Sequence, residues 1–265
     1  MFSFENARFH YDPYPIGLIA PVMAEDLYQS LVDNFPPLEL FHFLPRVGRK
    51  YVLSEKFNSV NYRKFIAQNP QWQELQRWIK SQAFVDEVDT MLCSHRIDLG
   101  LEHTRLVNHR AWTWRLGELA KGRWPQGDDA LRTRFEFSML PVDGGYVIPH
   151  TDTPRKIITL VVFMVNENEW EERHGGALEV DRMKDNRLAF NWMNEQVAFE
   201  DVECVRTLDF KPNQCVVFVK TFNSLHGVRP MTGGRDAMRR SITINIMRPE
   251  GRSKKTPNEK PPAVE

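Results

Sequence analysis

The sequence has 265 residues, of which 42% are hydrophobic and 11% aromatic, so it is long and apolar enough to bury a full core in one large domain. Its 35 basic and 35 acidic side chains give a formal net charge of +0, which excludes a global field that would recruit nucleic acid or a membrane surface. We therefore expect no nucleic-acid or membrane partner, and look to small molecules or a specific protein instead.

The cysteines and the first residues bear on the cellular compartment. Cys93, Cys204 and Cys215 are an odd, sparse set without a CxxC pair, which indicates neither a disulfide framework nor a thiolate zinc site. The opening residues 1–21 lack a basic leader followed by an apolar stretch, and no window approaches 18 uninterrupted apolar residues. These features predict a soluble protein of the reducing cytoplasm, and they leave its oligomeric state open.

The N-terminal part, residues 1–130, contains the predicted helices. Residues 21–37 carry apolar side chains at helical spacing and stop at Pro36, which indicates a short amphipathic helix. Residues 70–95 contain no internal proline or glycine after Pro70 and also follow helical spacing, which predicts one long helix or two in tandem. We expect this part to be a helical support region.

Residues 131–248 have a different character and predict a mainly β core. Short β-rich runs are separated by glycine, proline, asparagine and aspartate: RFEFSML, YVIP, KIITLVVFMV, GALEV, QCVVFVK and RRSITINIM. They predict an antiparallel sandwich or barrel, and with the helices an α+β fold class forming one structural domain. The tail, residues 249–265, is polar and proline-rich, so we expect it to be flexible.

Two candidate metal ligands stand at the start of one predicted strand. His150 and Asp152 precede a run of ten residues in which only Lys156 and Thr159 are polar. In extended chain their side chains point the same way, so they can share one ion. The best third ligand is His226, directly after the apolar run QCVVFVK. Two imidazoles and one carboxylate on one face of a metal are typical of non-heme iron(II) oxygenases.

On these residues the sequence resembles the 2-oxoglutarate- and iron(II)-dependent oxygenases, in particular their prolyl-hydroxylase-like branch. The matching pieces lie between about residues 135 and 247: GGYVIPHTD, GGAL, SLHGVRPM and RRSITINI. The resemblance implies a double-stranded β-helix, or jelly roll, buttressed by N-terminal helices. It further implies His150, Asp152 and His226 as catalytic metal ligands, Fe(II) as the metal, and 2-oxoglutarate and O2 as cosubstrates. Because Asp152 is present, hydroxylation is favoured over halogenation.

The resemblance also implies a basic residue that holds the far carboxylate of 2-oxoglutarate, and two arginines compete for that role. Arg239 shares its strand parity with Ser241 and two further polar residues, whereas Arg240 shares its parity with isoleucines. A polar face inside a small barrel is consistent with a ligand pocket. Arg239 and Ser241 also reproduce the RxS pattern of the family, so we predict that they bind the carboxylate together. Arg240 would then face outward.

Other residues have a functional and a structural interpretation. Tyr146 could lie near the cofactor pocket or simply pack in the core. The tryptophans and arginines of residues 110–124 could line a substrate mouth, or pack on the sheet with solvated charges. His174, His103 and His109 are interpreted as structural.

The leading hypothesis is a dioxygenase that hydroxylates an unactivated carbon of a polar small molecule or amino-acid residue, releasing succinate and CO2. Two alternatives stay open at this point. One is a jelly-roll iron or other metal enzyme that does not use 2-oxoglutarate and needs no arginine deep in its pocket. The other is a non-catalytic metal-binding module.

Overall fold

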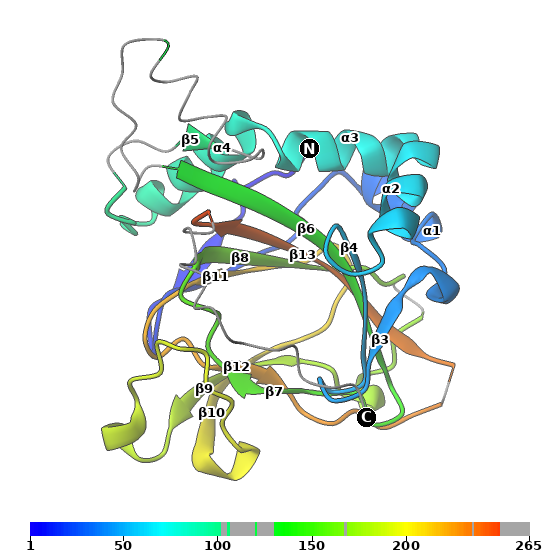
Figure 1. The fold of residues 1–265 in the computed structure, drawn as a ribbon. Coiled ribbons are helices and arrows are strands. Elements are labelled where there is room, and N and C mark those ends of the chain that lie inside the picture. Colours follow the sequence, from blue (N-terminus) through cyan, green and yellow to red (C-terminus); the bar gives the residue numbers. More distant parts are fainter. Residues whose placement is uncertain (102–104, 107–119, 121–129, 167–168, 235, 250–265) are drawn as a thin grey trace, which may run out of the picture.

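The computed structural model describes residues 1–249, apart from 102–104, 107–119, 121–129, 167–168 and 235. In this part of the chain the fold is mainly β with a few helices. Two antiparallel sheets face each other (Figure 1). The larger has the path β1-β2-β11-β8-β13-β6-β4-β3, with β5 beside β6, and the smaller has the order β10-β9-β12-β7.

The C-terminal strands pass back and forth between the two sheets. They are β6 (Ala130–Pro141), β7 (Val147–His150), β8 (Lys156–Phe163), β9 (Leu178–Met183), β10 (Val202–Leu208), β11 (Cys215–Val219), β12 (His226–Val228) and β13 (Met238–Met247). Strands β6, β8, β11 and β13 belong to the larger sheet, and β7, β9, β10 and β12 to the smaller. All six predicted β-rich runs are confirmed as strands. Strand β10 was not predicted, because its sequence VECVRTL mixes charged and apolar residues.

The central strands of the larger sheet have two distinct faces. Ile242, Ile244 and Ile246 belong to the main apolar cluster under the helices. The alternate residues Ser241 and Asn245 are also buried, but on the face turned toward the smaller sheet. The polar face predicted for this strand is therefore the inner face of the two-sheet structure.

Helices cover the outer face of the larger sheet, at the top of Figure 1. They are α1 (Glu25–Asp33), α2 (Ser59–Gln68), α3 (Pro70–Ile79) and α4 (Gln82–Ser94). Short 3-10 turns occur elsewhere along the chain: η1 (Leu38–Leu40), η2 (Glu172–His174), η3 (Asn186–Leu188) and η4 (Phe199–Asp201). The long predicted segment is thus two helices in tandem. The break occurs because the Ser81 hydroxyl accepts a hydrogen bond from the backbone N–H of Phe84 and caps α4.

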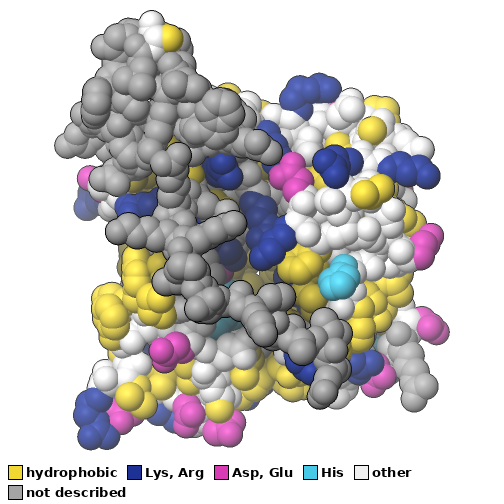
Figure 2. Space-filling model, in the orientation of Figure 1, with side chains coloured by type: hydrophobic (Ala, Val, Ile, Leu, Met, Phe, Trp, Pro, Cys, Tyr) yellow, Lys and Arg dark blue, Asp and Glu magenta, His cyan; other side chains and the backbone are white. Residues whose placement is uncertain are grey.

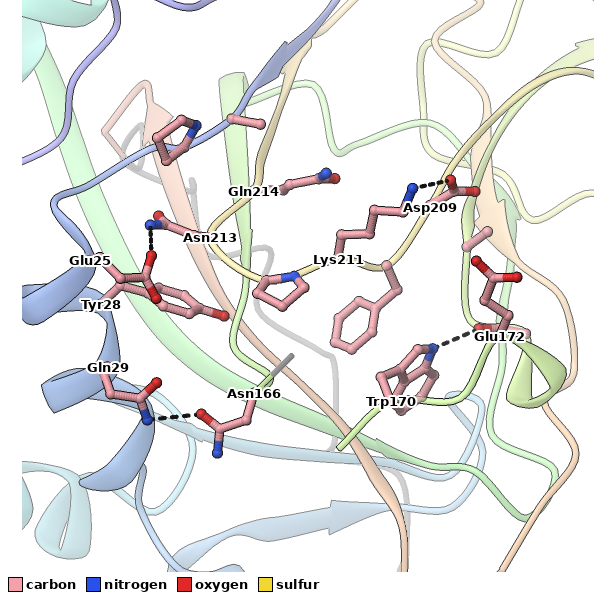
Figure 3. A pocket seen from close by; sticks show the side chains of 16 residues that line it. Glu25, Tyr28, Gln29, Asn166, Trp170, Glu172, Asp209, Lys211, Asn213 and Gln214 are labelled. Atoms are coloured by element: carbon pink, nitrogen blue, oxygen red, sulfur yellow. Dashed lines mark hydrogen bonds and ion pairs between the residues drawn. The ribbon is translucent and has the colours of Figure 1, made fainter. Parts of the chain in front are cut away.

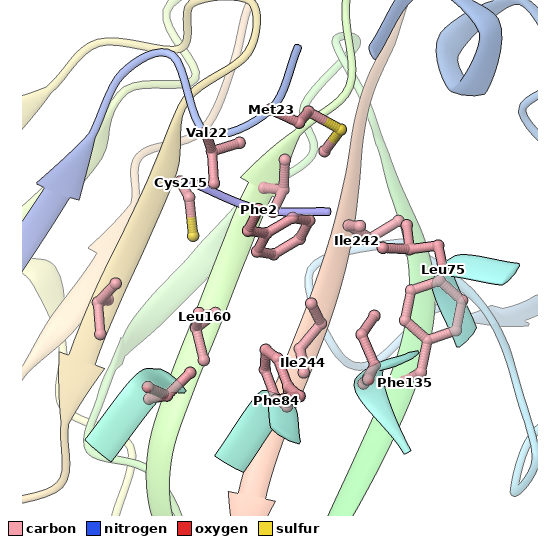
Figure 4. Close-up of a cluster of buried hydrophobic side chains, with 14 of the residues drawn as sticks. Phe2, Val22, Met23, Leu75, Phe84, Phe135, Leu160, Cys215, Ile242 and Ile244 are labelled. Atoms are coloured by element: carbon pink, nitrogen blue, oxygen red, sulfur yellow. The ribbon is translucent and has the colours of Figure 1, made fainter. Parts of the chain in front are cut away.

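The largest apolar cluster lies between these helices and the sheet (Figure 4). Leu75 and Phe84 come from α3 and α4, and they belong to one cluster with Leu160, Ile244 and Phe135 of the strands. All five side chains are fully buried. Burial of each such side chain stabilises the fold by about 1.5–3 kcal/mol, so this layer fixes the position of the sheet that carries the site.

The N-terminal part contributes strands as well as the expected helices. They are β1 (Arg8–His10), β2 (Ile16–Ile19), β3 (His42–Leu44), β4 (Lys50–Ser54) and β5 (Arg105–Leu106). Strand β2 pairs with β11, and β4 pairs with β6, so both extend the larger sheet. No helix in the described residues is long and apolar enough to span a membrane.

Candidate active site

Strand pairing brings the three predicted metal ligands together. His150 ends β7, and His226 begins β12 directly opposite it in the smaller sheet. Asp152 follows two residues after His150. One ligand atom from each of the three side chains lies within 4.8 Å of the others. Asp152 and His226 are buried, and the two imidazole rings lie 4.6 Å apart between their centroids.

Both imidazoles are held in a form that can bind a metal. The Nδ1 atom of His150 lies 2.9 Å from the carbonyl oxygen of Ile148, and that of His226 lies 3.0 Å from the carbonyl oxygen of Ser224. A proton on each Nδ1 leaves Nε2 free as a ligand. Burial, followed by the neighbouring His226, lowers the pKa of His150 to about 3, and burial also lowers the pKa of His226. Both rings are therefore neutral at physiological pH.

Asp152 is held as a carboxylate. The ammonium of Lys156 donates to one carboxylate oxygen at 2.5 Å, and the hydroxyl of Thr159 donates to the other at 2.5 Å. Burial alone would raise the pKa of Asp152, but Lys156 and the two imidazoles outweigh it and hold the pKa well below its usual range. In the sequence, Lys156 and Thr159 are the two polar residues in an otherwise apolar run of ten. That interruption was the signal for their role.

This donor set fits iron(II). Two neutral imidazole nitrogens and one carboxylate are the residues of the facial triad, which leaves the remaining positions open for other ligands. The carbonyl groups of Ile148 and Ser224 and the ammonium of Lys156 hold the three side chains in place before a metal binds.

Arg239 lies on the inner face of β13 with a buried and incompletely satisfied charge. Its side chain is 4% exposed, and its Nε donates to the carbonyl oxygen of Gly176 at 2.7 Å. The guanidinium lies over the rings of Phe163 and Phe210, at 5.1 and 4.6 Å. Its Nη2 has no hydrogen-bond partner among the described residues. Burial lowers the pKa of Arg239 to about 9. The charge therefore favours an anionic partner.

Arg240 and Ser241 lie where strand parity predicts. Arg240 forms an ion pair with Glu169 and lies over the ring of Phe35, 5.7 Å away, so it faces away from the inner cavity. Ser241 is buried on the same face as Arg239, where its hydroxyl oxygen lies 3.1 Å from that of Ser138. Whether Ser241 also contacts a bound carboxylate stays a prediction.

Gly176 makes room for the arginine. Its φ is +80°, and an added Cβ would lie 2.8 Å from the Trp170 ring and 3.0 Å from the sulfur of Met231. Any larger residue would disturb the packing of the loop whose carbonyl group orients Arg239. The GGAL motif is thus explained by backbone conformation and close packing.

The remaining predicted residues lie apart from this cluster or outside the described chain. The Tyr146 ring is partly buried and packs edge-on against Phe199, at 6.4 Å between ring centroids, and both of its interpretations stay predictions. His174 is buried against Trp170, at 5.4 Å between ring centroids, as expected of a structural histidine. His103, His109 and the tryptophans of residues 110–124 lie outside the described residues.

A pocket of about 880 Å³ lies at the opposite end of β8 and β11 from the metal ligands (Figure 3). Trp170 and Phe210 form part of its wall, and Phe210 also contacts the guanidinium of Arg239. Its polar side chains interact with one another, as Lys211 does with Asp209 at 3.1 Å. The pocket is lined by none of the metal-ligand candidates or Arg239.

The family comparison agrees with this geometry. Residues 135–247 match the model of the 2OG-Fe(II) oxygenase superfamily. The match runs from inside β6 to the end of β13, which is less than half of the chain. The protein is therefore an oxygenase whose cofactors are Fe(II), 2-oxoglutarate and O2, and the His150, Asp152 and His226 cluster could hold the iron. A search of curated proteins finds no significant match.

Similar solved structures include a prolyl hydroxylase from Trichoplax adhaerens in complex with a hypoxia inducible factor peptide, at 14% identity and a TM-score of 0.47, covering 88% of this chain and 83% of that one. A prolyl-4-hydroxylase from Pseudomonas putida is 16% identical with a TM-score of 0.45, covering 89% and 93%. HygX from Streptomyces hygroscopicus, with nickel, 2-oxoglutarate and hygromycin B bound, is 9% identical with a TM-score of 0.46, covering 88% and 82%. Similarity at this level assigns no substrate to this chain.

Proposed function

We propose that this oxygenase hydroxylates an unactivated carbon of a polar small molecule or amino-acid residue and releases succinate and CO2. His150, Asp152 and His226 would hold the iron. Bound iron(II) would supply oxygen activation coupled to the decarboxylation of 2-oxoglutarate. The strands that alternate between the sheets from β6 to β13 support a double-stranded β-helix, with residues 1–130 and 131–248 in one structural unit.

The observation that carries the proposal is the buried guanidinium of Arg239, whose Nη2 has no hydrogen-bond partner among the described residues. A buried charge with a free N–H group is unfavourable unless an anion binds to it. The far carboxylate of 2-oxoglutarate is such an anion, and a guanidinium can bind a carboxylate through two parallel hydrogen bonds. A metal enzyme that does not use 2-oxoglutarate has no need of this residue. The same observation therefore favours the oxygenase over the alternative metal enzyme.

Basic side chains on the inner face support a polar, anionic substrate. Lys50 and Arg134 both pair with Glu136, at 3.2 and 2.6 Å, and their side chains stay 25% and 28% exposed. Burial opposes ionisation of Glu136, but Lys50, Arg134 and Lys156 together lower its pKa, so these three cations lie within electrostatic reach of one carboxylate. Lys and Arg side chains also gather in the middle of the face shown in Figure 2. A positive surface of this kind favours substrates with a carboxylate or phosphate group.

The first test measures cosubstrate use. Anaerobic addition of iron(II) and 2-oxoglutarate to the metal-free protein should produce a visible charge-transfer band, and admission of O2 should release succinate. The Arg239→Met variant should need at least about 30-fold more 2-oxoglutarate, since loss of a buried charged partner costs about 2–5 kcal/mol. Arg240→Met is the matched control and should leave this requirement unchanged. A protein that stays colourless and makes no succinate would refute the proposal.

The second test concerns the substrate. Succinate release should be screened across paired metabolites and amino-acid derivatives that differ only in a carboxylate or phosphate group, with mass spectrometry for a product heavier by one oxygen. We expect the anionic member of a pair to be preferred, and Lys50→Ala to weaken that preference. Equal turnover of charged and neutral members would show that the basic side chains do not select the substrate.

A further inference from the structure

A second cluster of possible metal ligands lies on the opposite face of the smaller sheet from His226, which pairs with Val180 between Glu179 and Asp181. Glu179 and Asp181 alternate with Val180 on β9, and Cys204 on β10 is the direct pairing partner of Asp181. One ligand atom from each of Glu179, Asp181 and Cys204 lies within 4.8 Å of the others. Val180 packs into the inner apolar cluster, so the two carboxylates lie on the opposite, outer face of the sheet.

The carboxylates of this cluster are buried without enough partners. Asp181 is 0% exposed, and neither of its oxygens has a hydrogen-bond partner in the described chain. Glu179 is 8% exposed; Arg229 donates to its Oε1 at 2.8 Å, while its Oε2 is buried and lacks a partner among the described residues. Three acceptor oxygens thus lie buried beside a thiol. Buried carboxylates are normally paired with a cation or bound to a metal.

The electrostatics of the cluster point the same way. Burial and then the charge of Glu179 raise the pKa of Asp181 to about 7, against a smaller opposing effect of Arg229. Burial, Glu179 and Asp181 likewise raise the pKa of the Cys204 thiol. The charge of Glu179 thus makes ionisation of both Asp181 and Cys204 less favourable. A divalent cation would reverse this effect, because it stabilises all three ionised groups at once.

We propose that Glu179, Asp181 and Cys204 form a second divalent-cation site, separate from the oxygenase centre, with zinc as the preferred ion. A thiolate with two carboxylates suits zinc better than magnesium or calcium, which prefer oxygen ligands alone. Tetrahedral ligands at about 2.0–2.3 Å from zinc lie on the order of 3.5 Å apart, so small side-chain rotations close the cluster around an ion. Binding would release the thiol proton and link β9 to β10.

Cobalt(II) provides a test that separates the two sites. Cobalt bound by the histidines and Asp152 has only nitrogen and oxygen ligands, whereas cobalt at the second site has a thiolate ligand and a sulfur-to-cobalt charge-transfer band. We expect metal-free protein to bind two cobalt ions and to show this band. The band should disappear in Cys204→Ser and persist in Cys93→Ser, whose cysteine is exposed and outside the cluster.

Variants at the two sites make the result independent of the oxygenase proposal. A His150→Ala, His226→Ala double variant should lose one ion and keep the thiolate band and zinc binding. Asp181→Asn should lower zinc affinity at least tenfold and leave succinate release unchanged. Its unfolding in the presence of chelator checks that the variant folds. One bound ion in the wild type, a band that survives Cys204→Ser, or unchanged zinc affinity in Asp181→Asn would each overturn the proposal.

Discussion

Asp152 and Asp181 are two buried aspartates close to the same small sheet, and their environments differ sharply. Asp152 lies with the inner-face histidines, and each of its oxygens accepts a hydrogen bond, one from Lys156 and one from Thr159. Asp181 lies on the outer face, and its oxygens accept none from the described residues. The pKa of Asp152 is held well below its usual range, whereas burial raises the pKa of Asp181 to about 7.

The difference shows that burial alone does not decide the charge of a carboxyl group. Both side chains are less than 10% exposed. A nearby ammonium and a hydroxyl keep Asp152 ionised before any metal binds, so its site is prepared for a cation. Asp181 accepts no hydrogen bond within the described part of the chain, so its burial is favourable only when a cation binds or when the carboxyl group keeps its proton. The following experiments test this contrast.

Removal of the inner carboxylate should have the largest effect. Asp152→Ala takes away one of three iron ligands, so iron affinity should fall by more than about 100-fold, since even changes to residues behind the ligands cost about 10–100-fold. Iron content after equilibrium dialysis and succinate release would measure it. Asp181→Ala is the matched variant on the outer face. If it impaired iron binding as much as Asp152→Ala, the two aspartates would not have separate roles.

The next experiment removes the two hydrogen-bond donors of Asp152, so that its carboxylate, like that of Asp181, accepts no hydrogen bond from them. In the double variant Lys156→Met, Thr159→Val, both hydrogen bonds to the carboxylate are lost while the side-chain volumes are roughly kept. Iron affinity should fall about 10–100-fold, because the carboxylate is no longer oriented or kept ionised. The loss should be larger at low pH, where the unsupported carboxylate takes up a proton. Wild-type affinity at every pH would show that these donors do not prepare the site.

In metal-free protein, replacement of the outer aspartate, Asp181, should change the free energy of unfolding by a smaller amount. The pKa of Asp181 rises from 3.8 to about 7 on folding, so the unfolded chain loses its proton first. The raised pKa therefore lowers the free energy of unfolding. This loss is absent below pH 3.8, grows as the pH rises, and is complete above pH 7. In chelator, Asp181→Asn should raise the free energy of unfolding by about 2 kcal/mol near pH 8 and by almost nothing near pH 4. Urea unfolding at both values measures this. A pH-independent difference would contradict the assignment.

The smallest change in the free energy of unfolding should come from replacing Asp12, an exposed carboxylate that pairs with Arg182 of β9. Arg182 of β9 donates to both oxygens of Asp12, at 2.6 and 2.8 Å, but the Asp12 side chain is 79% exposed. Exposed ion pairs contribute about 0–1 kcal/mol. Asp12→Asn should therefore lower the free energy of unfolding by less than about 1 kcal/mol, and less still in high salt. A larger loss would mean that solvent exposure does not separate these carboxylates.

Much of the inner site was predictable because its pattern is local. His150 and Asp152 are two residues apart in a strand, and His226 follows the next apolar strand in the predicted order. Strand parity also separated Arg239 from Arg240, since polar and isoleucine residues alternate along β13. Periodicity within one segment was enough for His150, Asp152 and the two arginines, whereas His226 was chosen by its place after a separate apolar strand. The assignment of metal and cosubstrate roles rested on the family resemblance in addition.

The outer cluster and the N-terminal strands were not predictable in this way. Cys204 reaches Asp181 only through the pairing of β9 with β10, and the sequence of β10 mixes charged and apolar residues without the regular alternation that indicates a strand. Strands β2 and β4 are four and five residues long, and they are stabilised by β11 and β6, which lie far along the chain. Short strands owe their structure to such distant partners. Only the three-dimensional pairing reveals them.

The pairing of β2 with β11 has a consequence for the limits of the catalytic unit. The family segment begins inside β6, so an excised fragment of residues 135–247 would start partway along a central strand and lack the neighbour of β11. It would also lose the helices over Leu160 and Ile244. Bare strand edges beside an uncovered apolar surface promote self-association. We therefore predict that the first third of the chain folds together with the family segment, and that any grafting or domain exchange has to carry it along.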